Sequence, residues 1–118
     1  MSKSGDSPYA YEGLDRVLHE RARLSIMASL SGQKQGLSFA ELKRLCGLSD
    51  GNLSRHLQVL ETSGFVQIEK GYEGKRPHTS CKITQPGIKA FMKYIDVLEQ
   101  VVKDAGKVTA GTRKPTRS

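Results

Sequence analysis

"SFAELKRLCGLSDGNLSRHLQVLETSGFV", residues 38–66, predicts two helices separated by a short turn. Ser38 stands three residues before Glu41, which is the spacing of a capping box at a helix N-terminus. Gly47 is placed to end the first helix, and Ser49 is placed to cap the second. The first helix has only about two turns, so it needs a neighbouring element to pack against.

The second helix, expected over residues 50–62, is amphipathic. Leu53, Leu57 and Leu60 follow the i, i+4, i+7 spacing of one narrow apolar face. The opposite face and its flanks are polar or small, because successive side chains rotate by about 100° around a helix. These positions, which we call the recognition face, are Gly51, Asn52, Ser54, Arg55, Gln58 and Thr62. Such a face is either solvated or contacts a polar partner.

A β-hairpin with a basic tip is expected next. Val66 and Ile68 alternate with polar residues, and Cys81 and Ile83 do the same further along the chain. The two runs are joined by roughly seven residues, more than a tight hairpin turn needs. The connection includes residues 74–77, "GKRP", so its charge is positive.

The remaining segments complete one domain. Residues 1–8 are small and polar and are expected to form a disordered N-terminus. Apolar spacing over 9–30 predicts helix, with a break near His19 into two helices. Residues 85–105 predict a final helix, and 106–118 a disordered basic tail.

The order of elements predicts a mainly α fold with a small β-hairpin, of the α+β class. Helices over residues 9–105 would flank a two- to three-stranded antiparallel sheet, to which Leu37 can add one short strand. The final helix carries more apolar surface than a terminal helix needs, which favours packing against a second copy of the chain. A wide buried face within one chain is the alternative. The residues expected at a dimer interface are Tyr11, Leu14, Phe91, Tyr94, Ile95, Leu98, Val101 and Val102.

Positive charge is concentrated in the second half of the chain. The 118 residues carry 19 Lys and Arg against 12 Asp and Glu, a formal charge of +7. Residues 1–69 are neutral in sum, so the excess lies in the hairpin, the final helix and the tail. This distribution favours a polyanionic partner, nucleic acid before a membrane. No leader or membrane-spanning stretch is apparent, so we expect a cytoplasmic protein.

The sequence offers little for catalysis or for metal binding. His19, His56 and His78 are dispersed, and no carboxylate pair, nucleophile motif or phosphate-binding glycine loop is present. Cys46 and Cys81 stand in apolar settings without a CxxC pattern, so both are interpreted as small buried side chains. We therefore expect no enzyme activity, no cofactor and no metal site.

Four stretches carry a resemblance to a known family: "RARLSIMASL" (21–30), residues 38–66, "GKRPHT" (74–79) and "KITQPGIKAF" (82–91). Together they resemble the winged helix-turn-helix domain of bacterial and archaeal regulators, close to the multiple-antibiotic-resistance (MarR) and arsenic-repressor (ArsR) groups. The resemblance implies that the second helix enters the DNA major groove. Ser54 and Arg55 then occupy DNA-facing positions, Arg55 can fork onto guanine, and Gln58 or Asn52 can pair with adenine.

The resemblance also assigns the hairpin, or wing (71–78), to the flanking DNA backbone or minor groove. The wing residues expected to contact DNA are Lys70, Lys75, Arg76, Pro77 and His78. Ser38, Lys43 and Arg44 are placed to contact phosphates. Each of these has an ordinary solvated surface role as its alternative.

The function implied is a homodimeric DNA-binding transcriptional regulator of a pseudopalindromic operator, with repression as the commoner outcome in the family. Two alternatives keep the same fold: a sequence-tolerant architectural DNA-binding protein and a protein-interaction module. The sequence departs from ArsR proteins, whose metal signature has two cysteines in one helix, because only Cys46 is present there. It also lacks the length for the long helices that frame the effector pocket of MarR proteins, so the sequence does not support a small-molecule effector and leaves its existence open.

Overall fold

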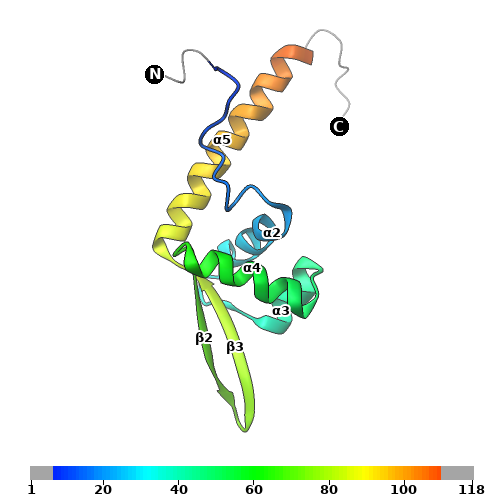
Figure 1. Ribbon diagram of the computed structural model, residues 1–118, viewed down its shortest axis with the longest axis vertical. Coiled ribbons are helices and arrows are strands. Elements are labelled where there is room, and N and C mark those ends of the chain that lie inside the picture. The colour runs from blue at the N-terminus through cyan, green and yellow to red at the C-terminus, as the bar shows by residue number, and fades with distance from the viewer. Residues whose placement is uncertain (1–6, 110–118) are drawn as a thin grey trace.

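The computed structural model describes residues 7–109. Its elements are, in order, α2 (Arg21–Ser31), β1 (Leu37–Ser38), α3 (Phe39–Cys46), α4 (Asp50–Thr62), β2 (Val66–Glu73), β3 (Arg76–Ile83) and α5 (Gln85–Thr109). Helices α2, α3 and α4 form the body, from which the β2–β3 hairpin and the far half of α5 project in opposite directions (Figure 1). The expected α+β fold with a three-stranded antiparallel sheet is confirmed.

The two short helices form where their caps predicted them. Ser38 Oγ accepts from the Glu41 backbone N–H at 3.1 Å, and Glu41 Oε1 accepts from the Ser38 N–H at 2.9 Å. These two bonds are the reciprocal capping box that the spacing indicated. Gly47 then ends α3 with φ +65, and Ser49 Oγ caps α4 by accepting from Asn52 N.

The expected helix before α2 is wrong: residues 7–20 form turns and bends, and α2 begins only at Arg21. The segment follows α5 instead (Figure 1), held by a Tyr11 hydroxyl that donates to Asp104 and by a His19–Tyr94 hydrogen bond of 2.8 Å. Leu18 is fully buried in the core. The apolar spacing therefore serves packing along another helix. Of the expected disordered N-terminus, residues 1–6 lie outside the described residues.

The hairpin is longer and tighter than expected. β2 pairs with β3 from Val66↔Ile83 to Glu73↔Arg76, so the connection is Gly74 and Lys75 alone rather than about seven residues. Gly74 has φ +67, the left-handed conformation that favours glycine at the first position of a two-residue turn. The sequence concealed this because the hairpin leaves the core beyond Ile68, and both faces of β2 are then exposed, so the alternation of buried and exposed residues ends.

The core joins the helices to the sheet. Leu53, Leu57 and Leu60 of α4 are 0%, 3% and 0% exposed, which confirms the predicted apolar face. They belong to one cluster with side chains from α2, the sheet and the first half of α5. Phe91 and Tyr94 belong to this cluster at 8% and 1% exposure. Because both pack within the protomer, neither is available for the expected contact with a second copy.

α5 begins against the junction of α4 and β2. Thr84 Oγ1 donates to the Gly64 carbonyl at 2.6 Å and accepts from Gly87 N at 3.0 Å, so it caps α5 while tying it to the preceding turn. The Thr84 N–H donates to the Phe65 carbonyl. α5 continues to Thr109, four residues beyond its expected end, so only residues 110–118 of the expected tail remain, outside the described residues.

Gly87 should be intolerant of a side chain. A Cβ there would overlap the backbone carbonyl oxygen of Phe65, which cannot move without disturbing the start of β2. We expect Gly87→Ala to lower the free energy of unfolding by about 2 kcal/mol through overpacking. Gly106→Ala is the matched control in the same helix, because its Cβ meets open space and should leave stability equal or higher by up to about 1 kcal/mol. Urea denaturation measures both; equal stability of the two variants would contradict this account.

Candidate nucleic-acid interface

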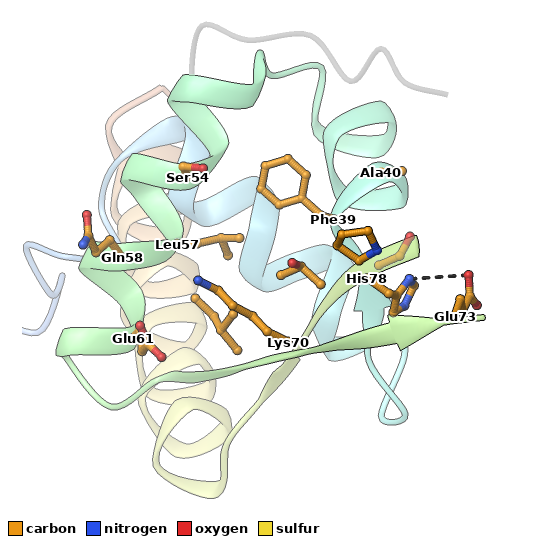
Figure 2. Close-up of a pocket in the computed structure, with 13 residues that line it drawn as sticks. Phe39, Ala40, Ser54, Leu57, Gln58, Glu61, Lys70, Glu73 and His78 are labelled. Atoms are coloured by element: carbon orange, nitrogen blue, oxygen red, sulfur yellow. Dashed lines mark ion pairs between the residues drawn. The ribbon is translucent and has the colours of Figure 1, made fainter. Parts of the chain in front are cut away.

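A groove of about 1010 Å³ lies between the N-terminus of α3, one side of α4 and the hairpin. We call it the interface groove; its lining residues are Ser38, Phe39, Ala40, Ser54, Leu57, Gln58, Glu61, Ile68, Lys70, Glu73, Pro77, His78 and Thr79. Figure 2 shows Ser54 and Gln58 along α4 on one side and Lys70 reaching toward them from β2 on the other. The groove thus brings together parts of all three sets of predicted DNA contacts.

The recognition face of α4 is fully available to a partner. All six of its residues, Gly51, Asn52, Ser54, Arg55, Gln58 and Thr62, are exposed, while the leucines of the opposite face are buried. Ser54 and Gln58 line the groove, whereas Asn52, Arg55 and Thr62 lie outside its lining. The anchoring leucines therefore leave a polar helix surface that continues beyond the groove.

The basic side chains divide into paired and unpaired groups. Lys43 is paired with Asp50 at 2.8 Å across the turn between α3 and α4. Among the residues that the structure describes, no side-chain hydrogen bond or ion pair engages the exposed cations Arg44, Arg55, Lys70, Lys75 and Arg76. An unpaired cation keeps its full charge for an anionic partner, so these five are the stronger candidates for DNA contact.

Acidic groups border the groove as well. The His78 Nδ1 and Glu73 Oε1 atoms lie 3.7 Å apart, the contact drawn as a dashed line in Figure 2. Glu61 lines the groove from α4, below Gln58. The backbone N–H and the side chain of Ser38 both hydrogen-bond with Glu41 and lower the pKa of that carboxyl, so it stays ionised beside the α3 N-terminus. Phosphates are therefore tolerated only where Lys70 and the wing cations offset these carboxylates.

His56 connects α4 to α2 through a hydrogen bond with Arg23. A guanidinium has only N–H donors, so Arg23 donates to His56 Nδ1 at 3.1 Å, which places the imidazole proton on Nε2. The same guanidinium donates through Nε to the Val17 carbonyl at 2.6 Å. Half-buried His56 therefore links α4 to α2 and to the N-terminal segment. The sequence carried no signal for this link, because its partners stand more than thirty positions apart.

The register of the hairpin adds groove residues that sequence reasoning missed. Lys70 pairs with Thr79, and both line the groove together with Ile68. Thr79 had no pattern of its own, and its place became visible only once the two-residue turn set the register. Lys75 and Arg76 stand at the tip, beyond the groove lining.

The described residues contain neither a cluster that could hold a metal ion nor a helix that could cross a membrane. Within residues 7–109, no group of three His, Cys, Asp or Glu side chains is placed to hold a metal ion. Cys81 is buried, which raises the pKa of its thiol to about 12, and Cys46 is half-buried. None of the helices in the described part of the chain is long and apolar enough to cross a membrane.

A family model for a winged helix DNA-binding domain matches residues 22–102. The chain belongs to the winged helix DNA-binding domain family. The match spans every element from α2 into α5, including the interface groove. A protein of Methanocaldococcus jannaschii, itself uncharacterised, is similar over 89 residues with 37% identity, covering 75% of this chain and 96% of that protein.

Solved structures share the winged helix fold. A transcriptional regulator homologue from Pyrococcus horikoshii has a TM-score of 0.70 and 26% identity, covering 89% of this chain and 98% of that one. A protein from Enterococcus faecalis described as a MarR-family regulator has a TM-score of 0.66 at 20% identity, covering 93% and 94%. The M. tuberculosis regulator MosR, solved with DNA, has a TM-score of 0.62 at 22% identity, covering 91% and 74%. These named neighbours are described as transcriptional regulators, and their likeness to this chain shows the shared winged helix fold.

The capping box at the groove should make stability depend on pH. Because folding lowers the pKa of Glu41 from 4.5, the ionised carboxylate stabilises the fold above that pH, and this contribution is lost as pH falls through the folded pKa. Glu41→Gln keeps an acceptor for the Ser38 N–H but does not titrate. Between about pH 5 and about pH 3 the variant should lose less stability than the native chain, measured by urea midpoints. Parallel loss in both proteins would show that Glu41 contributes nothing.

Proposed function

We propose that this winged helix protein is a cytoplasmic transcriptional regulator that binds duplex DNA as a homodimer and represses the genes it controls. Each protomer places α4 in a major groove and its β2–β3 wing on the flanking backbone and minor groove. One observation carries the proposal: Ser54 and Gln58 of the recognition face line the same groove as Lys70 of the wing. A partner that occupies this groove meets hydrogen-bonding groups and positive charge together.

The recognition face supports base reading. A helix is the element that fits the major groove, where each base pair presents its own donor and acceptor pattern. The Arg55 guanidinium has no partner among the described residues, so it can donate two bonds to guanine, and the Asn52 and Gln58 amides can each pair with adenine. α4 lies in the half of the chain without net charge, so it is suited to specificity rather than to general attraction.

The wing supports attraction. Lys70, Lys75 and Arg76 are exposed, and among the described residues none of them has an internal ion pair. Pro77 and His78, which follow Arg76 on β3, line the groove together with Lys70. Three phosphate contacts were expected around α3. Within residues 7–109 Arg44 has no hydrogen bond or ion pair, although its charge acts on the Glu41 carboxylate; Ser38 already accepts a bond in its capping box, and Lys43 is paired with Asp50.

α5 supports a dimer. Its far half projects beyond the body, and in the described chain only the N-terminal segment lies beside it (Figure 1). With Phe91 and Tyr94 used in the core, the candidate contact surface is half-buried or exposed; it consists of Tyr11, Leu14, Ile95, Leu98, Val101 and Val102. A second copy packed there would relate two α4 helices by a twofold axis, matching a pseudopalindromic operator with half-sites about 10 base pairs apart.

Selection of bound sequences from a random duplex pool tests the proposal. A regulator should enrich a motif with two related half-sites. Binding without an enriched motif would favour the architectural alternative, in which wing and tail lead. A failure to bind any duplex at low salt would overturn the proposal and favour a protein-interaction role.

Substitutions should separate specificity from attraction. Arg55→Ala should weaken binding to the enriched site by about 1–3 kcal/mol while leaving random duplex nearly unaffected, because a bond to guanine matters only where that base is present. Lys93→Ala, an exposed cation on α5 outside the groove, is the control and should change neither. Fluorescence anisotropy with both duplexes measures the affinities; equal losses on both would remove Arg55 from base reading.

The wing cations should control the dependence of binding on salt. The double variant Lys75→Ala with Arg76→Ala should weaken binding to specific and random duplex alike. The slope of log affinity against log salt should become shallower by about 0.9 for each phosphate that is no longer neutralised. An unchanged slope would place both side chains away from the DNA backbone.

A further inference from the structure

Tyr72, near the tip of the wing, is a large aromatic side chain left in solvent. It is 74% exposed, more than the other exposed large hydrophobic side chains of the described chain, which include Tyr9 at 66%. Within that part of the chain it has no side-chain hydrogen bond and no aromatic partner. A single exposed ring is ordinary on a protein surface, so a partner for Tyr72 has to be inferred from its neighbours on the wing.

The register of the hairpin places Tyr72 on one strand face with residues that line the groove; Tyr72 itself lies beyond the lining, and Glu73 and His78 line the groove from the other face. Side chains two positions apart share a face of a strand, so Tyr72 lies on the same face as Ile68 and Lys70, both of which line the groove. Pro77 stands directly opposite Tyr72 on β3, and it also lines the groove. Tyr72 and Pro77 therefore form an apolar pair, which we call the tip pair, that extends the groove wall toward the tip.

Tyr72 and Lys70 are far enough apart along β2 to contact different parts of a DNA duplex. Tyr72 lies about 7 Å beyond Lys70, at about 3.3 Å for each residue of strand. If Lys70 lies at the backbone that borders the major groove, the tip pair reaches past that backbone to the minor groove. Lys75 and Arg76 lie beside the pair, and no ion pair engages either of them among the described residues, so their two positive charges exceed the single negative charge of Glu73, which stands opposite Arg76.

We propose that Tyr72, backed by Pro77, inserts into the DNA minor groove and packs its ring against the sugars that form the groove walls. This inference rests on the proposed function, since it assumes that the interface groove holds DNA. The contact is apolar, so it contributes affinity on every sequence and releases no counterions. It differs from Arg55, which acts on one sequence, and from Lys75 and Arg76, which act on every sequence but release counterions because they act through charge.

An optical test uses the absence of tryptophan from the chain. Tyr72→Trp introduces a single indole at the tip, and its emission should be quenched or shifted to shorter wavelength when duplex DNA is added. Tyr9→Trp is the matched control, because Tyr9 is similarly exposed but lies in the N-terminal segment, and its emission should not change. Anisotropy of the labelled duplex reports binding independently. Binding by Tyr72→Trp without a change in its emission would overturn the inference and leave the proposed function intact.

An affinity test separates an apolar contact from a polar one. Tyr72→Ala should weaken binding to specific and random duplex by about tenfold, as expected when an aromatic side chain that packs on nucleic acid is removed. Its salt slope should equal that of the native protein, and Tyr72→Phe should bind as the native protein does. Unaltered thermal unfolding would confirm that each variant is folded. Native affinity in Tyr72→Ala, or a shallower salt slope, would overturn the inference, whereas failure of the native protein to bind DNA would overturn it together with the proposed function.

Discussion

Burial of Leu53, Leu57 and Leu60 is the constraint on which the rest of this winged helix depends. Three leucines on one narrow face allow α4 to pack in only one rotational setting, because turning the helix would expose them and bury polar side chains. The recognition face is therefore the geometric complement of the leucine face. His56 adds a polar link to Arg23 on α2, which opposes sliding or rolling of the helix.

The same core decides where the two projecting elements point. Thr84 and Gly87 bring the start of α5 against the backbone of Gly64 and Phe65, at the point where α4 gives way to β2. The hairpin and α5 leave this junction in opposite directions (Figure 1). The surface proposed for DNA and the surface proposed for a second copy therefore lie at opposite ends and share no residues.

The basic side chains of the protein differ in whether an acidic side chain within the chain pairs with them. Lys43 forms an ion pair with Asp50 and the His78 imidazole lies 3.7 Å from Glu73, whereas no ion pair engages Lys75 or Arg76 among the described residues. Carboxylates beside the groove oppose a phosphate that is badly placed, and the wing cations favour one that is well placed. Charge complementarity of this kind contributes orientation as well as attraction.

The sequence by itself determined α3, α4, their caps, the buried leucines and the exposed recognition face. These features depend on residues within a few positions of one another, so spacing and cap chemistry are enough to predict them. Residue pattern and charge predicted the hairpin and a nucleic-acid partner, and resemblance to a family added the expected role of the hairpin as a wing on DNA. Only the tertiary structure decided that residues 7–20 run along α5 without forming a helix, and that Phe91 and Tyr94 are used in the core. Only the tertiary structure also set the Gly74–Lys75 turn and thereby the facing of Lys70, Tyr72 and Thr79. Each of these outcomes depends on contacts between residues distant in the chain or on a strand register that no local pattern records, which is why they could not be predicted from the sequence alone.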